Sequence, residues 1–269
     1  VAVDKNQNNA FLEGLNFYAS PNLTFNSTVR KYSAGYRSFY ANSFGERANA
    51  NNEMGLYTGL SINLGKGYSL KSYLDLYAFP SLSYGKDSRV NGRDVFVELR
   101  KKLSNSSTIY VRAKAEKRIV NSDDRQNLDE VSRVRLHYKR EVGNLTFQSR
   151  IVVSFYNSLE QGFLFFQDIN TSLRKVSVST RLAYFNTPNY QSAVYAYQPN
   201  FLYAFRSKAY FNQGFQVLFM TKFHLSRKLK LWLKYQRVHY LNRDSVGSSY
   251  YQTNVPFLTE VSFQLQFLI

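Results

Sequence analysis

The chain has 269 residues, including 22 tyrosines and 22 phenylalanines but no cysteine, so its length suits one large domain and its composition excludes a disulfide-stapled scaffold and thiol chemistry. Lysine and arginine number 35 against 18 aspartates and glutamates, a formal net charge of +17. Nucleic-acid binders gather such charge in one patch, arm or helix, whereas here the cations alternate along strand-like segments, and we therefore expect no nucleic-acid partner.

Alternation of apolar and polar residues with a period of two dominates the chain, in segments of about ten residues, the length that a tilted strand needs to cross a bilayer. No run of about eighteen apolar residues occurs, so we expect no transmembrane helix. In residues 70–78, Leu74 and Leu76 alternate with Tyr73 and Asp75. In chain order, the later segments of this kind are residues 108–116, 133–139, 147–155, 229–236 and 260–269.

Each predicted strand has one apolar face and one polar face. The last strand is the clearest, because Val261, Phe263, Leu265 and Phe267 alternate with polar side chains. The polar faces are basic, and the cations that we expect there are Arg112, Lys114, Arg133, Arg135, Lys139, Arg150, Lys230 and Lys234. A soluble sandwich would bury the apolar faces, whereas a transmembrane barrel would turn them to lipid and the cations to an aqueous lumen.

Short and long connections alternate between the predicted strands. The short turns are residues 20–22, 64–67, 104–106 and 142–144, and the long polar stretches are residues 37–52, 80–92 and 121–129. Outer-membrane barrels have short periplasmic turns and long extracellular loops. After Phe185 the connections no longer alternate between short and long, and we expect that a strand is wrongly assigned within residues 186–214. Residues 241–257 form the last predicted extracellular loop, which leaves a periplasmic C-terminus.

Three features favour the transmembrane barrel over the soluble sandwich. The strands are long, the apolar faces carry few glycines or prolines, and aromatic residues gather near the predicted strand ends, as interfacial girdles do. The predicted girdle residues are Tyr68, Tyr77, Phe79, Tyr156, Tyr184, Phe185, Tyr240, Tyr250 and Tyr251. We therefore predict an all-β fold in which residues 1–269 form one antiparallel transmembrane β-barrel of about 14 strands, located in the bacterial outer membrane and in contact with its lipid bilayer.

The chain starts with Val1-Ala2-Val3-Asp4, with no initiator methionine and no export signal. Because an outer-membrane protein needs an export signal, we expect upstream sequence to be missing. A periplasmic turn at residues 20–22 also implies that the strand before it starts outside the cell. On this interpretation the chain is the C-terminal part of a larger barrel.

Five stretches are informative together: NEMGLY at 52–57, LKSYLDLYAFP at 70–80, QGFLFFQD at 161–168, YAY at 195–197 and LWLKY at 231–235. They resemble the C-terminal barrel region of a family of Bacteroidota outer-membrane β-barrel proteins that carry helix-hairpin-helix repeats upstream. The resemblance covers most of the chain from about residue 30 onward. This sequence lacks the helix-hairpin-helix part and has Gln198 where the family has an acidic residue. The resemblance implies an outer-membrane location and no established enzyme activity.

The basic polar faces have two interpretations. In an open lumen the cations would raise the local potential and draw anions in. Alternatively, they would pair with inward carboxylates such as Glu98, Glu116 and Glu260, or face a plug. The sequence leaves both interpretations open.

Catalytic and metal chemistry have little support. The chain has three histidines, His137, His224 and His239. We interpret them as lumen-lining polar residues rather than as parts of a hydrolase site, because no Ser/His/Asp grouping follows from their spacing. One predicted loop holds four acidic residues, Asp123, Asp124, Asp129 and Glu130. Their spacing matches no calcium loop, and we expect no enzyme activity, catalytic residue, metal or cofactor.

The favoured function is that of a structural or accessory subunit of an envelope assembly, with other outer-membrane or periplasmic proteins as partners. The first alternative is an anion-preferring, porin-like pore with a basic lumen. The remaining alternative is a hydrolase embedded in the barrel that uses one of the three histidines.

Overall fold

The computed structural model describes residues 1–38, 44–46, 49–81, 90–122, 125–205, 207–247 and 249–268, and for residues 119–122, 125–128 and 251 it describes the backbone alone. No helix in this described part has the length and apolar character needed to cross a bilayer. One short 3-10 helix, η1 (Ser249–Tyr251), accompanies the strands. The strands of the main sheet are β1 (Ala2–Val3), β2 (Asn9–Ser20), β3 (Leu23–Tyr32), β4 (Glu53–Gly65), β5 (Tyr68–Phe79), β6 (Val90–Ser104), β7 (Ser107–Ser122), β8 (Arg125–Val142), β9 (Leu145–Tyr156), β10 (Glu160–Ser172), β11 (Val176–Thr187), β14 (Asn212–His224), β15 (Leu229–Tyr240) and β16 (Phe257–Phe267).

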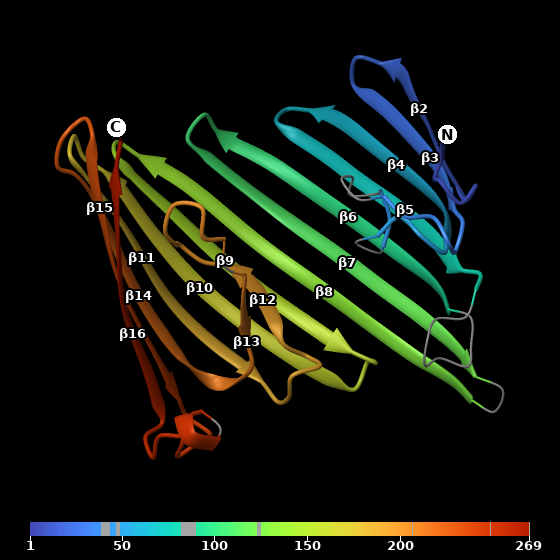
Figure 1. The fold of residues 1–269 in the computed structure, drawn as a ribbon. Helices are drawn as coiled ribbons and strands as arrows, with labels where there is room; N and C mark the ends of the chain where they lie inside the picture. The colour runs from blue at the N-terminus through green and yellow to red at the C-terminus, as the bar shows by residue number, and fades with distance from the viewer. Residues whose placement is uncertain are drawn as a thin grey trace. The chain divides into compact units, whose positions relative to one another are not determined.

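The main sheet has 14 strands in the order β1-β2-β3-β4-β5-β6-β7-β8-β9-β10-β11-β14-β15-β16 (Figure 1). Neighbours pair antiparallel; for example, Leu74 of β5 lies opposite Thr58 of β4 and Val95 of β6. The prediction of an all-β antiparallel fold with about 14 strands is confirmed. In the described chain, β1 and β16 end the order without pairing to each other, so closure into a barrel stays a prediction.

The described strands fall into two compact units. Unit 1 comprises residues 1–101 and 112–133, and unit 2 comprises residues 102–111 and 134–269. Strands β6, β7 and β8 contribute residues to both units. That residues 1–269 form one domain stays a prediction.

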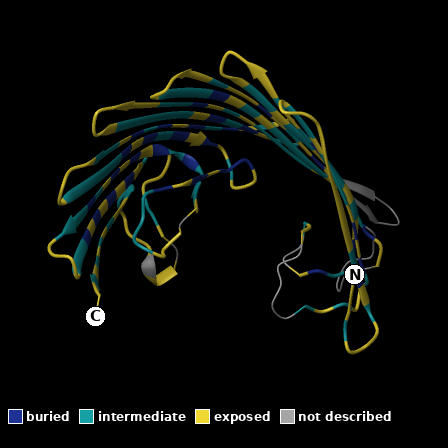
Figure 2. Cartoon of the chain, turned by 90° about the horizontal axis from the view of Figure 1, so that it is seen from above, coloured by how far each residue is buried: buried dark blue, intermediate teal, exposed yellow. Residues whose placement is uncertain are grey.

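In unit 1 the two faces of the sheet differ sharply in exposure. On β5, Leu74 and Leu76 are 38% and 44% exposed, whereas Asp75 and Tyr77 on the other face are 7% and 5% exposed. Figure 2 shows this alternation of exposed and more buried residues along the strands. We call the side with Leu74 and Leu76 the apolar face of unit 1 and the side with Asp75 its charged face. A water-soluble sandwich would show the reverse pattern, with the apolar side chains buried.

In unit 2 the same alternation leaves one face apolar and exposed. On β16, Val261, Phe263, Leu265 and Phe267 are 77%, 75%, 59% and 65% exposed. On β11, Leu182 is 51% exposed and pairs with Val217 of β14, which is 43% exposed. We call this side the apolar face of unit 2.

The opposite face of unit 2 is covered by residues 188–211, which we call the insert. The insert holds a separate two-stranded sheet of β12 (Val194–Tyr197) and β13 (Ser207–Tyr210), drawn in front of β9 and β10 in Figure 1. Because these residues leave the main sheet, β11 pairs directly with β14. This departure explains why short and long connections no longer alternate in the sequence within residues 186–214.

The insert and the sheet share a hydrophobic core. Val194, Ala196 and Tyr210 of the insert pack with sheet residues that include Leu164 and Phe185. Val194 and Leu164 are fully buried, and the ring centroids of Phe185 and Tyr210 are 5.5 Å apart in an edge-to-face arrangement. Burial of apolar area on this scale stabilises the insert against the sheet.

The connections are partly as predicted. Strands β2, β4, β6 and β8 are each followed by a turn of two residues, which confirms the predicted short turns. The long loop predicted at residues 121–129 is wrong in its described part, since β7 continues to Ser122 and β8 begins at Arg125. Polar side chains predicted a loop there. The hydrogen bonds between paired strands are made by backbone groups, however, and polar residues have the same backbone groups as apolar ones. The parts of the predicted long connections that lie outside the described residues are 39–43, 47–48, 82–89, 123–124 and 248.

Several predicted girdle aromatics face away from the apolar side of their sheet. Tyr77, Phe79 and Phe185 are 5%, 8% and 1% exposed, whereas Tyr68, on the apolar face, is 40% exposed. The girdle prediction is therefore wrong for these three residues. Nearness to a strand end does not decide the face, which changes with every residue along a strand.

Candidate functional site

The charged face of unit 1 is built around Arg30, which is buried together with two carboxylates. Its Nε lies 2.6 Å from Oε1 of Glu53 on β4, and its Nη1 lies 2.8 Å from Oδ1 of Asp75 on β5. Gly55 of β4 leaves room for this reach, because a Cβ atom there would lie 2.5 Å from Cζ of Arg30. One guanidinium group thus links three neighbouring strands.

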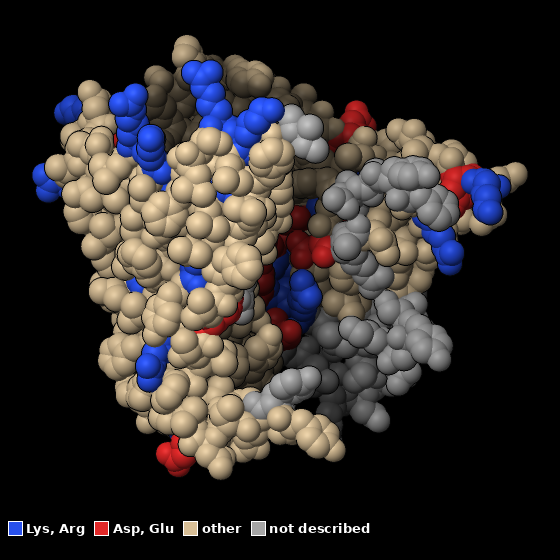
Figure 3. Space-filling model, turned by 60° about the vertical axis from the view of Figure 1, so that its left-hand side comes forward, with Lys and Arg blue, Asp and Glu red and all other residues tan. Residues whose placement is uncertain are grey.

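A second set of ion pairs joins β6 and β7. Nζ of Lys114 lies 3.0 Å from Oδ2 of Asp94 and also contacts the carboxylate of Glu116. Nη2 of Arg112 lies 2.5 Å from Oε2 of Glu98. Figure 3 shows acidic and basic side chains next to one another on the viewed side of the molecule. Cations and carboxylates therefore compensate each other on this face.

The eight basic residues predicted for the polar faces all lie on the side of their strands opposite the apolar face. Five of them form ion pairs: Arg112 with Glu98, Lys114 with Asp94 and Glu116, Arg133 with Glu116, Lys139 with Glu141, and Lys234 with Glu260. Arg150 instead donates from Nε to Nδ1 of His137 at 3.3 Å. Within the described chain, Arg135 and Lys230 form no ion pair. This distribution favours the interpretation in which most of the charge is compensated.

In unit 2 a buried ion pair anchors the insert. Nε and Nη2 of Arg181 on β11 lie 2.6 and 2.7 Å from the two carboxylate oxygens of Asp168 on β10. Nη1 of Arg181 donates to the backbone oxygen of Tyr197 in β12 at 2.7 Å. The guanidinium carbon lies 3.8 Å from the ring centroid of Phe166. The pair therefore holds two sheet strands and the insert together.

A chain of neutral hydrogen bonds runs beside this ion pair. The Tyr210 hydroxyl donates to Oε1 of Gln216 at 2.5 Å, Nε2 of Gln216 donates to Oε1 of Gln198 at 3.2 Å, and Nε2 of Gln198 donates to Oε1 of Gln236 at 3.0 Å. Burial raises the pKa of the Tyr210 hydroxyl above its ordinary value, so it stays a protonated donor. Gln198 thus links the insert to β14 and β15 by hydrogen bonds that need no charge.

Close backbone contacts complete the attachment of the insert. The Ser154 hydroxyl of β9 donates to the backbone oxygen of Ser192 at 2.5 Å. A Cβ atom at Gly162 of β10 would lie 2.3 Å from the same oxygen, so only glycine fits there without displacing the insert. Nζ of Lys234, a residue only 2% exposed, donates to Oδ1 of Asn200 at 3.2 Å.

Among the described side chains, the histidines and the acidic residues do not form one site. His137 is buried near Tyr110, with ring centroids 4.9 Å apart. His239 lies on the apolar face of unit 2 opposite Phe257, so the prediction that it lies on a polar face is wrong. Asp123 and Asp124 lie outside the described residues, and Glu130 pairs with Lys117 at 3.8 Å between Oε2 and Nζ. Among the described side chains no group of three or more could hold a metal ion. That the chain is not an enzyme and needs no cofactor stays a prediction.

Sequence reasoning missed the residues that hold the faces together. Arg30, Glu53, Asp168 and Arg181 were not singled out, although the period-two pattern places Asp168 and Arg181 on polar faces. The missing signal is register, because Arg30 and Asp75 are 45 residues apart in the chain and become neighbours only through strand pairing. A hydrogen-bond ladder supplies that information; a linear pattern does not.

No protein-family model matches the chain. No curated protein matches it either. Among solved structures the chain is similar to CdiB from Acinetobacter baumannii, with a TM-score of 0.49 and 10% sequence identity over 97% of this chain and 50% of that one. The chain therefore spans about half the length of that structure.

Proposed function

We propose that the chain is an outer-membrane β-barrel protein whose strands cross the bilayer with their apolar faces toward lipid. The observation that carries the proposal is the direction of the two faces, with Val261 and Phe263 more than 70% exposed while Arg30, Asp168 and Arg181 are buried. Exposed apolar area in water costs about 25 cal/mol per Å², whereas lipid removes this cost. Strands of 10 to 18 residues, such as β3 and β8, are long enough to span the hydrocarbon region.

The test uses the absence of native cysteine. Ser72 lies on the apolar face of β5, opposite Leu60 and Val97, and Ser69 lies on the charged face of the same strand. Each serine is replaced by cysteine, labelled with a fluorophore, and the protein is placed in vesicles that contain lipids with a nitroxide quencher on the acyl chain. We expect strong quenching at Ser72→Cys and little at Ser69→Cys. Equal quenching at both positions would remove the proposal.

Within the membrane, the role best supported is that of a structural or accessory subunit of an envelope assembly. The ion pairs of the charged face and the hydrogen bonds of the insert use polar groups for internal cohesion rather than for binding a substrate. The resemblance to the Bacteroidota barrel family also supports this role. Crosslinking in intact cells followed by purification tests it; recovery of the free monomer alone counts against the role.

An anion-preferring pore is the second candidate, because Arg135 and Lys230 form no ion pair within the described chain. Two uncompensated cations facing an aqueous path would raise the local concentration of anions. Planar-bilayer recording tests this candidate, with the double variant Arg135→Gln/Lys230→Gln as comparison. We expect anion preference that falls in the variant. Absence of conductance, or a preference for cations, rules the pore out.

A further inference from the structure

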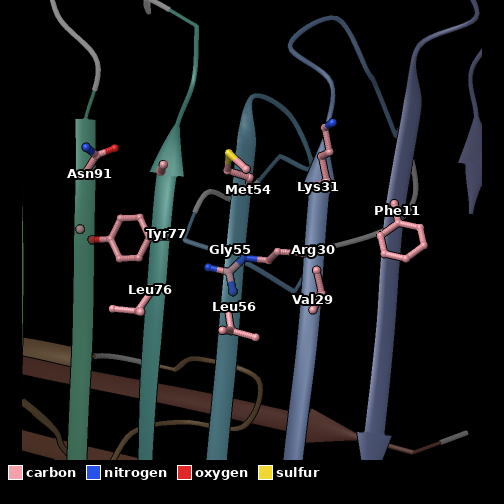
Figure 4. Close-up of a pocket in the computed structure, with 12 residues that line it drawn as sticks. Phe11, Val29, Arg30, Lys31, Met54, Gly55, Leu56, Leu76, Tyr77 and Asn91 are labelled. Carbon is pink, nitrogen blue, oxygen red and sulfur yellow. The ribbon is translucent and has the colours of Figure 1, made fainter.

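The apolar face of unit 1 contains a hollow of about 660 Å³ across β2, β3, β4, β5 and β6 (Figure 4). It lies between two rows of paired residues. One row runs from Lys31 through Met54 to Ala78, and the next row holds Leu56 and Leu76. Both rows lie near the ends of the strands that meet the long connections.

The floor of the hollow is backbone, because the residues between the two rows, such as Arg30 and Tyr77, turn their side chains to the charged face. Gly55 and Gly92 belong to this layer, and on the charged face the positions that their Cβ atoms would take are filled by Arg30 and Tyr77, at 2.5 and 2.3 Å. Figure 4 shows Arg30 reaching across to Gly55 while Lys31 stands at the strand end. Ala78, the smallest side chain of its row, leaves the space above this floor open.

Two cations flank the hollow. Lys31 lines it on the β3 side, and Arg93 lies on the β6 side, opposite Leu76. Both are exposed, and within the described chain neither forms an ion pair. Among the described residues one carboxylate lies close by on this face, that of Glu13 opposite Val29, and it forms no ion pair with Lys31. The rim is therefore cationic while the hollow itself is apolar.

We propose that this hollow binds an acyl chain of an anionic phospholipid. The lipid phosphate then lies at Lys31, and Arg93 attracts it from the other side of the hollow. The proposal rests on the proposed membrane function. Cations at the ends of membrane-spanning strands lie at headgroup depth, where each attracts an anionic lipid by about 1 kcal/mol. The apolar walls of Leu56 and Leu76 then meet the chain below the phosphate. The occupant of the hollow is therefore an anionic phospholipid rather than any lipid of the bilayer.

The experiment measures which lipid is enriched next to the hollow. Thr58 lies on the apolar face one row below Leu56 and does not line the hollow, so Thr58→Cys carries the fluorophore without filling it. Thr180→Cys, on the apolar face of unit 2, is the matched position away from the hollow. Quenching is compared between nitroxide-labelled phosphatidylglycerol and nitroxide-labelled phosphatidylcholine. Each cation contributes about fivefold, so we expect about 30-fold preference for phosphatidylglycerol at Thr58 and none at Thr180.

Substitutions separate the charge from the hollow. Lys31→Gln/Arg93→Gln removes both cations and Ala78→Phe fills the space, and we expect each of these variants to abolish the preference at Thr58. Lys101→Gln is the control, because Lys101 lies on the same face at the opposite strand end, with Nζ 3.4 Å from the ring centroid of Tyr68. Equal quenching by both lipids at Thr58 and Thr180 would overturn this inference and leave the membrane function standing. No quenching at either position would overturn both.

Discussion

Arg181 and Asp168 illustrate how single residues hold this protein together. Their two hydrogen bonds of 2.6 and 2.7 Å are buried, with side chains only 3% and 7% exposed. A third bond from Arg181 fixes the backbone of Tyr197. Loss of one charge leaves the other buried without compensation, which is far more costly than replacing both by apolar groups.

The variant Asp168→Asn is therefore expected to lower the free energy of unfolding by about 3–5 kcal/mol. Unfolding in urea can be followed by the fluorescence of Trp232, the one tryptophan of the chain. The double variant Asp168→Leu/Arg181→Met is the control, and we expect it to lose much less. A double variant as unstable as the single one would contradict the uncompensated-charge argument.

A second prediction at the residue scale concerns Gly162. Alanine there brings a Cβ atom to 2.3 Å from the backbone oxygen of Ser192, so the insert must shift, at a cost of about 1–3 kcal/mol. We expect faster tryptic cleavage at Lys208 of the insert. Gly14→Ala is the matched control, because its Cβ would meet Thr28 at an ordinary 3.4 Å. Similar cleavage in both variants would count against close packing at this contact.

At the scale of the strand, the two faces should respond oppositely to a charge. Ser179 and Thr180 are neighbours on β11; Thr180 pairs with Ile169 and Phe219 on the apolar face, and Ser179 pairs with Asn170 and Met220. In phospholipid vesicles we expect Thr180→Lys to cost up to about 2–4 kcal/mol and Ser179→Lys much less. The measurement is urea unfolding followed at Trp232. Equal losses would mean that neither face meets hydrocarbon.

The faces of individual strands could be predicted from the sequence because alternation depends on neighbouring residues alone. The strands at residues 70–78 and 229–236 lie as the pattern indicates, with Leu74 and Leu233 exposed. Contacts such as Arg30 with Asp75 could not be predicted, because they depend on the register of three strands and on the missing side chain of Gly55. The separation of the insert from the main sheet could not be predicted either, because its short apolar stretches have the same pattern as strands of the main sheet.

At the scale of the whole chain, the insert is the feature that departs from a simple succession of hairpins. Thr187 pairs with Asn212 at its base, so a two-residue Asn-Gly turn in place of residues 188–211 would join β11 to β14 in the same register. We expect this variant to keep its strand content by circular dichroism and to unfold at lower urea, because the shared hydrophobic core loses Val194, Ala196 and Tyr210. Loss of the strand signal would show that the sheet depends on the insert.

A segment that leaves and rejoins the ladder at one paired position can be lengthened, shortened or exchanged without moving a strand. The region between Thr187 and Asn212 can therefore change in length without a change of register between β11 and β14, while Val194 and Tyr210, which pack on the sheet, are expected to stay apolar. Recombination that exchanges the insert between homologues would change the residues that cover the polar side of unit 2 and preserve the strands of the main sheet.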